Sequence, residues 1–274
     1  KILTPKRKDV DFSDNLQTKN WFIKNKPSIV IIAAAKVGGI LSNKNFPADF
    51  ILENLKIQTN IIEESWKCGV KRLLFLGSSC IYPKYSSQPI KEEDLLNGKL
   101  ENTNEMYAIA KIAGLKLCHA LRLQYNFDAI SLMPTNLYGP GDNYDPKNSH
   151  VFASLIRKFS EAKFFNKKFV TCWGSGNPMR EFLHCDDLGE AALVALEKFD
   201  PEIKDNNGDW ITNNSHINIG SGKDISIKNL AEKIAIAIDF RGAIKWDKEK
   251  PDGTPKKLLN TQKIKDLGWT PQIK

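Results

Sequence analysis

The sequence predicts an α/β fold, with a doubly wound parallel sheet and a smaller C-terminal lobe. Two observations lead to this prediction. Short apolar runs rich in β-branched residues alternate with longer segments of helical periodicity over most of the 274 residues, which is typical of βαβ units and a parallel sheet. From about residue 134 onward, loops rich in proline, glycine and asparagine appear, such as residues 140–143 and 250–255. These loops indicate a second lobe whose segments are interleaved with the sheet domain.

The individual elements follow from the same patterns. The expected strands are short apolar runs, which span residues 2–4, 29–33, 71–76, 129–133, 169–172, 217–219 and 244–246. The expected helices repeat apolar residues three and four positions apart, and span residues 16–24, 48–67, 105–124, 151–163, 188–199 and 227–238. Short polar side chains accept hydrogen bonds from the free N–H groups at a helix start. We therefore expect Asp186 and Asp187 to cap the helix over 188–199, and Ser226 to cap the last one.

Bulk composition narrows the class of protein. Hydrophobic residues make up 41% of the chain, as in globular proteins, and the longest apolar run, residues 29–35, is far too short to span a bilayer. The five cysteines form no CxxC pair, which indicates reduced thiols and favours a cytoplasmic location. We expect no membrane partner.

The balance of charge is basic. Lysine and arginine exceed aspartate and glutamate by 40 − 32 = 8 residues. Such an excess would allow a nucleic-acid partner, but the lysines are scattered along the chain. A solvated basic surface is therefore the default expectation, and attraction of an anionic, nucleotide-like ligand is the next. We expect no nucleic-acid partner.

The most informative motif joins Tyr107 and Lys111 to Ser78. Residues four apart share one face of a helix, so the phenol of Tyr107 and the ammonium of Lys111 can point into one cleft. A free tyrosine has a pKa of about 10, and the neighbouring cation is expected to lower it toward neutrality. Ser78 follows the apolar run 72–76, at the carboxyl end of a parallel strand, where open α/β sheets bind ligands. The three side chains predict proton transfer at an oxygen while a hydride moves at the attached carbon.

Both ends of the chain depart from a complete dinucleotide-binding sheet of the Rossmann type. Such a sheet begins with a strand, a glycine-rich turn and a helix, but neither GxGxxG nor GxxGxxG occurs in the sequence. The chain opens on what resembles the second strand of that unit, and it stops soon after Leu267-Gly268-Trp269, where a closing helix is expected. We therefore expect the first βα unit and the last helix to be missing.

Longer stretches around the tyrosine motif carry a family likeness. They are the Leu-Leu-Phe-Leu-Gly-Ser-Ser-Cys-Ile-Tyr-Pro-Lys run at 73–84, the Tyr-Ala-Ile-Ala-Lys-Ile-Ala-Gly run at 107–114, and residues 133–140, 148–150 and 173–184. In these stretches, and over essentially its whole length, the chain resembles the GDP-L-fucose synthases, a family of extended short-chain dehydrogenases/reductases. The resemblance implies a bifunctional epimerase-reductase that converts GDP-4-keto-6-deoxy-D-mannose to GDP-L-fucose with NADPH, first epimerising C3 and C5 and then reducing C4. It also implies a GDP-linked hexose as substrate, a homodimer, and no metal.

The resemblance assigns a role to each catalytic candidate. Tyr107 is implied to be the general acid that protonates the C4 oxygen, Lys111 to hold the nicotinamide ribose, and Ser78 to bind the reacting carbonyl. Cys80 and His150 are implied to invert C3 and C5, because inversion needs a base on one face and an acid on the other. On the residues alone, Cys80 would be a small core residue and His150 a surface histidine.

The cofactor site is also implied by the resemblance. Its positions are Arg7, Ala34, Ala35, Lys36, Gly77, Ser78, Ser79, Lys111, Pro134, Thr135, Asn136, Leu137 and His150. The run Lys6-Arg7-Lys8 has cations where an adenosine 2′-phosphate would lie, whereas an NAD site would place a carboxylate there, so NADP is expected. Three solvated basic residues are the alternative interpretation. Asn54 is either a helper of the tyrosine helix or an ordinary polar helix residue.

The substrate site implied by the resemblance lies mostly in the C-terminal half. Its positions are Ser79, Lys158, Trp173, Arg180 and Asp252. The planar fork of an arginine suits a diphosphate, and a tryptophan face suits a sugar or base, although a core tryptophan is the competing interpretation. We expect residues 1–147 with parts of 169–220 to form the NADP-binding domain, and residues 148–168 and 221–274 to form the substrate-binding lobe.

Some positions depart from the family pattern or fall outside the expected site. Ala243 lies where an arginine is expected near the guanosine, and Asn260 replaces an aspartate. Guanine recognition is therefore less clearly implied than the chemistry. His184 and Asp187 are expected to be structural, at the junction of a strand and a capped helix.

Three alternatives remain open at this point. A 4,6-dehydratase of the same fold would carry a carboxylate after the serine strand, where this chain has Ser79-Cys80-Ile81. A simple 4-epimerase would need neither Cys80 nor His150. A non-catalytic RNA-binding relative would suit the positive charge, but it would have no reason to keep the tyrosine, lysine and serine together.

Overall fold

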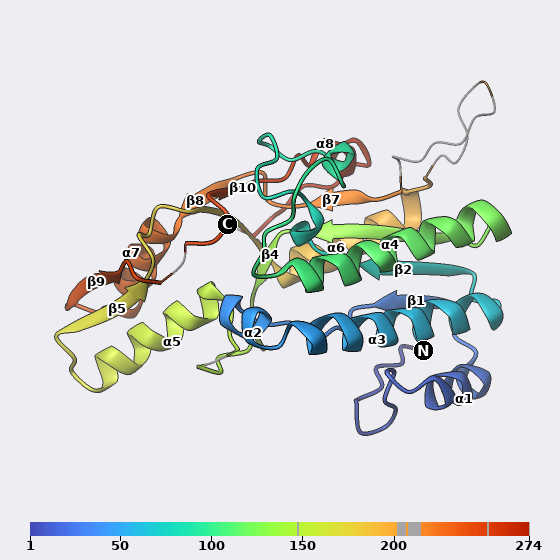
Figure 1. Cartoon of the computed structure of the whole chain (residues 1–274), viewed down its shortest axis with the longest axis horizontal. Helices are drawn as coiled ribbons and strands as arrows, with labels where there is room; N and C mark the ends of the chain where they lie inside the picture. Colours follow the sequence, from blue (N-terminus) through green and yellow to red (C-terminus); the bar gives the residue numbers. More distant parts are fainter. Residues whose placement is uncertain (147, 202–206, 208–214, 251, 274) are drawn as a thin grey trace.

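The computed structural model describes residues 1–146, 148–201, 207, 215–250 and 252–273. The remaining residues, which fall within the ranges of the two expected domains, lie outside the described part of the chain. In Figure 1 the molecule is elongated, with a central sheet and its helices on one side and a smaller group of strands and helices at the other end.

The central sheet contains the strands that position the site. It has the order β1-β2-β3-β7, with all neighbours parallel, and its strands are β1 (Ile29–Ile32), β2 (Arg72–Leu76), β3 (Ala129–Pro134) and β7 (Ile217–Ile219). Leu73, Leu74 and Phe75 of β2 are completely buried, as expected for a central strand covered on both faces. The parallel α/β fold predicted from the sequence is confirmed.

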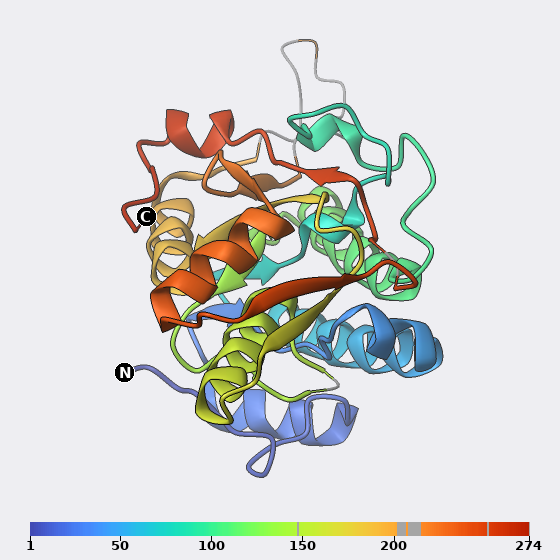
Figure 2. The ribbon, with the colours of Figure 1, turned by 90° about the vertical axis from the view of Figure 1, so that its left-hand side faces the viewer.

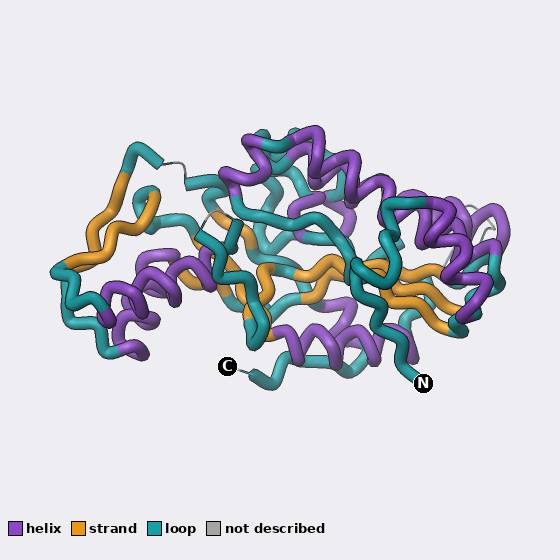
Figure 3. The backbone as a smooth tube through the Cα atoms, turned by 90° about the horizontal axis from the view of Figure 1, so that it is seen from below, coloured by secondary structure: helices purple, strands orange, loops and turns teal. Residues whose placement is uncertain are grey.

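Helices cover both faces of this sheet. On one face lie α3 (Pro47–Lys67) and α4 (Glu105–Tyr125), with α1 (Asn15–Asn25) packed outside α3, and on the other lies α6 (Cys185–Lys198). Figure 3 shows the strands between these helical layers. Successive side chains of a strand point to opposite faces, so Phe75 packs on the α3–α4 side and Leu74 on the α6 side. Close packing on the first side requires Gly114 of α4, because a Cβ there would lie 2.6 Å from Phe75 Cζ.

The smaller lobe lies at one end of the molecule and is seen end-on in Figure 2. It contains two small sheets and two helices. One sheet has the order β10-β6-β4, with β8 paired to β6, and the other pairs β5 with β9. The strands are β4 (Asn136–Tyr138), β5 (Phe169–Trp173), β6 (Met179–His184), β8 (Asp224–Ser226), β9 (Ala243–Asp247) and β10 (Lys256–Lys257). The helices α5 (Val151–Phe164) and α7 (Ile227–Ile238) pack over β5 and β9 in a separate hydrophobic core.

Several expectations about the elements need correction. Residues 2–4 form no strand, and Ile2 is almost fully exposed, so this apolar run has no layer to pack against. The helix α6 begins at Cys185, and its cap is His184, whose Nδ1 accepts a hydrogen bond from Asp186 N at 3.2 Å, in place of Asp186 and Asp187. The strands β4, β6, β8 and β10 were not expected, and neither were the short helices α2 (Ile40–Asn45), η1 (Ser79–Ile81), η2 (Glu92–Asp94) and α8 (Gln262–Asp266).

Across the residues that the structure describes, no helix combines the length and the apolar character needed to cross a membrane.

Candidate active site

The turn after β2 begins the candidate site. The strand ends at Leu76, and the Oγ of Ser78 accepts a hydrogen bond from Cys80 N at 3.2 Å, which starts the short helix η1. Gly77 lies against the neighbouring strand so closely that a Cβ would be 2.3 Å from Met133 Cε. The glycine therefore lets the two carboxyl strand ends approach each other, and the turn presents Ser78 and Cys80 beyond them.

The helix α4 brings Tyr107 and Lys111 to this turn. Ser78 forms a hydrogen bond with the Tyr107 phenol, and the Nζ of Lys111 donates to Leu76 O at 2.9 Å. The same Nζ lies 6.0 Å from the centre of the Tyr107 ring and 4.8 Å from that of Phe75. The structure thus places the serine, tyrosine and lysine around the end of β2.

The electrostatics of this group differ from the expectation. Burial raises the pKa of Tyr107, the negative charge of Cys80 raises it further, and the hydrogen bond with Ser78 offsets this only in part. Lys111 does not lower the pKa as expected, because its ammonium is directed at a backbone carbonyl and is itself buried. Burial lowers the pKa of Lys111 to about 8. Tyr107 is therefore held as a neutral phenol, the form that can donate a proton.

Cys80 lies among hydrogen-bond donors that the sequence did not reveal. Its Sγ accepts from Lys257 Nζ and from Asn104 Nδ2, both at 3.4 Å. Burial acts to raise the pKa of Cys80, but the Lys257 cation, the hydrogen bond with Ser78 and the more distant Arg180 outweigh it, so the pKa is lowered. The site therefore favours the thiolate, which is the basic and nucleophilic form of cysteine.

His150 lies at the start of α5, with its side chain exposed and not used to cap the helix within the described chain. Loss of hydration and the Lys257 cation lower the pKa of His150, while Asp142 opposes the shift. The same lysine thus acts on both members of the predicted epimerising pair. The lowered pKa favours the neutral imidazole near pH 7 and makes the protonated form of His150 a stronger proton donor.

On the cofactor side, the loop after β1 is fixed by Asn54 of α3. Its Oδ1 accepts from Lys36 N, and its Nδ2 donates to Lys36 O, each at 3.0 Å. The side chain of Lys36 pairs with Asp49 and Glu53 at 3.5 and 3.3 Å, so it is directed at α3. Ala34 is exposed and Ala35 half-buried, which leaves the backbone of this loop accessible. Asn54 therefore orders the loop after β1, where cofactor residues were predicted, by direct hydrogen bonds.

The other predicted cofactor residues named here lie in three places. Arg7 is exposed and pairs only loosely with Asp11, at 3.9 Å. Pro134 ends β3, and Asn136 and Leu137 belong to β4. Ser79 is buried in η1, beside the turn already described.

Glu181, which is not among the residues predicted for the site, connects the β3–β4 segment to the segment that carries Lys257. Thr135 Oγ1 and Asn136 Nδ2 both donate to its backbone O, at 3.1 and 2.8 Å. Its carboxylate is fully buried and accepts from Gly222 N at 2.6 Å and Leu259 N at 3.0 Å. Burial raises the pKa of Glu181 against these hydrogen bonds. The carboxylate fixes the segment just after Lys257.

The predicted substrate residues lie in two groups in the smaller lobe. Lys158 Nζ lies 5.2 Å from the ring centre of the half-exposed Trp173 and donates to Thr171 O at 3.2 Å. Arg180 Nη2 donates to Asp252 O at 3.3 Å. Burial lowers the pKa of Arg180.

Asp252 is engaged by the protein itself. Its two carboxylate oxygens accept from the backbone N and the Oγ of Ser175, at 2.7 and 2.8 Å. Gly174, at φ +78°, makes room for it, because a Cβ there would lie 2.2 Å from Asp252 Oδ1. The carboxylate thus closes the loop that follows Trp173.

The remaining candidates occupy structural positions. Asp187 accepts from Gln272 N and Ile273 N, at 2.9 and 3.1 Å. His184, Cys185 and Asp186 bring ligand-type atoms within 4.8 Å of one another, with the imidazole already used as a helix cap.

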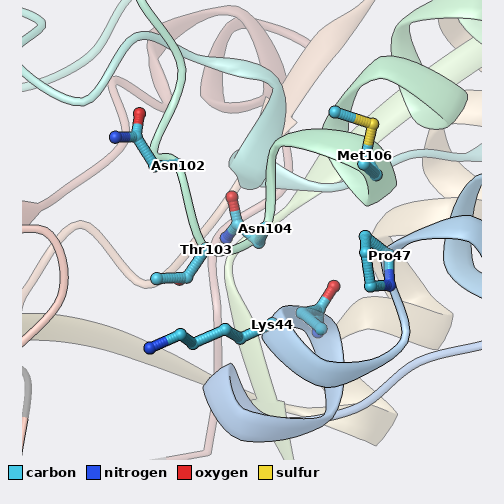
Figure 4. A pocket seen from close by; sticks show the side chains of 7 residues that line it. Lys44, Pro47, Asn102, Thr103, Asn104 and Met106 are labelled. Carbon is cyan, nitrogen blue, oxygen red and sulfur yellow. The ribbon is translucent and has the colours of Figure 1, made fainter.

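A cavity of about 180 Å³ borders the site, between α2 and the first turn of α4. Figure 4 shows Lys44 and Pro47 on one side of it and Asn102, Thr103, Asn104 and Met106 on the other. Asn104 separates this cavity from Cys80, since it lines the cavity and contacts the sulfur.

A serine–tyrosine pair and a helical lysine at the carboxyl end of a parallel sheet define the class of extended short-chain dehydrogenases/reductases. The profile of the NAD dependent epimerase/dehydratase family matches residues 3–220. The chain belongs to this family and, within it, to the GDP-L-fucose synthases, as the sequence indicated.

The relatives and solved structures agree. Probable GDP-L-fucose synthase 1 of Oryza sativa subsp. japonica is 50% identical over 97% of this chain and 77% of its own length. GDP-L-fucose synthase of Escherichia coli K12 is 48% identical over 97% and 82%. A GDP-6-OMe-4-keto-L-xylo-heptose reductase from C. jejuni superposes with a TM-score of 0.92 at 34% identity, over 99% of this chain and 86% of that one. A GDP-L-fucose synthetase from Naegleria fowleri bound to NADP has a TM-score of 0.83 at 28% identity, over 98% and 81%.

Proposed function

We propose that this protein converts GDP-4-keto-6-deoxy-D-mannose to GDP-L-fucose with NADPH, by epimerisation at C3 and C5 followed by reduction at C4. The observation that supports this most directly is that a serine and a cysteine two residues apart face different partners. Ser78 binds the neutral phenol of Tyr107, and Cys80 lies between Lys257 and Asn104 as a favoured thiolate. The turn therefore brings together an acid for the C4 oxygen, the phenol of Tyr107, and a base for C3 and C5, the thiolate of Cys80.

The base is suited to the first step. The protons on C3 and C5 flank the C4 ketone, so their removal leaves an enolate whose charge lies on the C4 oxygen. The thiolate of Cys80 takes the proton from one face, and the C–H electron pair moves into the enolate. His150, in its imidazolium form, then donates a proton to the carbon from the opposite face, which inverts the centre and leaves the neutral imidazole that its lowered pKa favours.

The acid is suited to the second step. Tyr107 donates its proton to the C4 oxygen, and Ser78 holds that oxygen by a hydrogen bond. NADPH, when bound, supplies the hydride to C4. Because the phenol has a raised pKa, it keeps its proton until charge develops on the oxygen.

The residues of the cofactor loop fit a dinucleotide. Ala34 and Ala35 leave the backbone accessible at the carboxyl end of β1, and Asn54 holds that backbone in place. Lys111, buried at the end of β2, would hold the ribose next to the nicotinamide. Arg7 supports a preference for NADP, because it is an exposed cation that is engaged only by the loose pair with Asp11.

We assign the sugar nucleotide to the smaller lobe, and we propose that residues 148–168 and 221–274 form the substrate-binding part. Trp173 with Lys158 offers a flat face and a cation, and Arg180 offers a fork for the diphosphate. Asp252 would act mainly by closing its loop, because Ser175 already occupies its carboxylate.

We further propose a homodimer formed through α3 and α4. Leu52, Ile109 and Tyr125 of these helices are exposed, which supports an apolar contact between two copies. Light scattering after gel filtration should give twice the chain mass, and Leu52→Glu should reduce it to the mass of a monomer. A cytoplasmic location remains a prediction from the free cysteines.

The decisive experiment is turnover in D₂O. With NADPH and GDP-4-keto-6-deoxy-D-mannose, the product should be GDP-L-fucose with deuterium at C3 and C5. Cys80→Ser should still oxidise NADPH with an already inverted substrate but should fail to invert C3 and C5. A product reduced at C4 with both centres retained, or normal deuterium incorporation by Cys80→Ser, would contradict the assignment.

A further inference from the structure

Asn104 occupies the cap position of α4 without capping the helix. The helix begins at Glu105, and Ala108 N donates to Asn104 O at 3.0 Å, so the backbone of Asn104 is in the usual cap position. Asparagine is among the preferred caps, because its side-chain oxygen accepts from an N–H group of the first turn. Here its side chain makes no such bond within the described helix, and its Nδ2 donates to Cys80 Sγ at 3.4 Å instead.

The other end of the same amide is also unusual. The Oδ1 of Asn104 is buried and has no hydrogen-bond partner among the residues that the structure describes. A buried polar atom without a partner is rare in folded proteins and calls for an explanation. The contact with the sulfur is thus the one bond that fixes the orientation of this amide within the described chain.

The surroundings of the sulfur favour its anion. Asn104 and Lys257 both point donors at Sγ, and Arg180 adds a positive charge from β6. Donors that bind the charged form of a group favour that form. Tyr107 is the acidic group on the other side, and the charge of Cys80 helps to keep its proton on.

We propose that Asn104 is a positioning residue that holds Cys80 as a thiolate directed into the site. This proposal rests on the proposed function for its catalytic meaning, because it makes the base of the first step available. Tyr107 follows Asn104 by three positions, so the start of α4 holds both the residue that contacts the thiolate and the phenol. Holding the thiolate also holds the phenol in its neutral form, which the second step needs.

The test is the pH dependence of alkylation of Cys80 by iodoacetamide, followed peptide by peptide so that Cys68 and Cys185 are resolved. Asn104→Ala removes the donor, and Asn104→Asp replaces it with a carboxylate of the same size. Both should move the inflection of Cys80 alkylation to higher pH, Asn104→Asp by more. A shift of one pH unit lowers the rate well below the inflection by about tenfold. The plateau rate of alkylation at high pH is not the criterion. Removing the Asn104 side chain would open the cavity of Figure 4 toward the sulfur, and easier access of the reagent alone would change that rate.

Asn102→Ala is the matched control, because Asn102 is exposed and lines the same cavity. It should leave the inflection unchanged. An inflection in both Asn104 variants equal to that of the unmodified protein, with the folded circular dichroism spectrum retained, would overturn the proposal. The alkylation needs no sugar, so it decides the role of Asn104 even if the proposed reaction is wrong. If the reaction is right, Asn104→Asp should also slow deuterium exchange at C3 and C5 more than the reduction of an inverted substrate.

Discussion

Lys257 and Cys80 are separated by 177 positions in the chain, yet the ammonium of the lysine donates to the sulfur at 3.4 Å. The lysine belongs to β10, which pairs with β6 over two residues. Glu181 of β6 holds the next segment through Leu259 N, so the position of the lysine depends on a buried carboxylate of the smaller lobe. The cysteine at the end of the central sheet therefore receives its counter-charge from the other part of the molecule.

Lys257→Gln should raise the pKa of Cys80, because burial would then act with less opposition. A rise of one pH unit reduces the thiolate fraction near neutral pH by about tenfold. The rate of Cys80 alkylation as a function of pH measures this directly. Lys256→Gln, on the same strand as Lys257, is the control, since the Nζ of Lys256 pairs with Asp224 of β8 at 3.3 Å. Equal inflections in Lys257→Gln and the unmodified protein would show that the cation does not act on the sulfur.

Tyr107→Phe should abolish reduction while it leaves epimerisation measurable. Loss of a positioned acid typically costs about 10²- to 10⁴-fold in rate. NADPH oxidation should fall by that factor, deuterium should still enter C3 and C5, and binding of NADPH followed by its fluorescence should change little. Tyr85→Phe, on an exposed loop, should behave as the unmodified protein. Normal reduction by Tyr107→Phe would remove this residue from the mechanism.

Lys111→Met should stabilise the fold near neutral pH at the expense of activity. Burial lowers the pKa of Lys111 from 10.5 to about 8, so the folded state disfavours the charged lysine. Below pH 8, Lys111 carries its proton in both the folded and the unfolded chain. The cost of burying this charge then lowers the free energy of unfolding by its full amount, on the order of 3 kcal/mol. The lost hydrogen bond to Leu76 O offsets about 1 kcal/mol of the gain.

This gain should fade between pH 8 and 10.5, because the folded lysine gives up its proton first as the pH rises. Urea unfolding at pH 7 and at pH 10.5 measures the difference, with Lys116→Met on the same helix as control. A destabilised Lys111→Met protein at pH 7 would show that the buried ammonium carries no net penalty.

Asn54→Ala should loosen the cofactor loop. It removes both hydrogen bonds to the backbone of Lys36 and leaves those groups without their partner, which costs about 1 to 3 kcal/mol of unfolding free energy. If about 1.4 kcal/mol of this falls on the bound loop, the Kd for NADPH should rise about tenfold. Asn60→Ala is the control on the same helix, since Asn60 Nδ2 bonds to Phe12 O at 2.9 Å, away from this loop. Unchanged NADPH binding by Asn54→Ala would mean that the loop is ordered by other contacts.

The sequence predicted elements whose signals are local. The helix α7 has the predicted bounds at both ends, because Ser226 supplies a cap and its Oγ accepts from Asn229 N at 3.1 Å. The strand β6 was missed, because its charged residue Glu181 looks unsuited to a buried strand. That carboxylate is satisfied by Gly222 N and Leu259 N, 41 and 78 positions downstream, which no local pattern reveals.

The same distinction applies to the site. Ser78, Tyr107 and Lys111 were found from spacing, because one strand end and one helix turn bring them together. Lys257 was missed because its partner is remote in sequence, and Asn104 because an asparagine before a helix looks like an ordinary cap. The expected lowering of the Tyr107 pKa failed for a different reason, since spacing says nothing of how deeply a phenol is buried.

The close fit at Gly114 has a consequence for how the chemistry can be altered. The helix that carries Asn104 and Tyr107 is seated on Phe75 and Gln58 with no room for a methyl group, since a Cβ at Gly114 would lie 2.6 and 2.8 Å from them. A larger residue there would displace α4 as a whole. The displacement would move the Tyr107 phenol and also Asn104, which contacts the Cys80 thiol. Changes on the packed face of α4 would thus impair proton removal and C4 reduction together, whereas among changes on this helix those near its N-terminus could separate the two half-reactions.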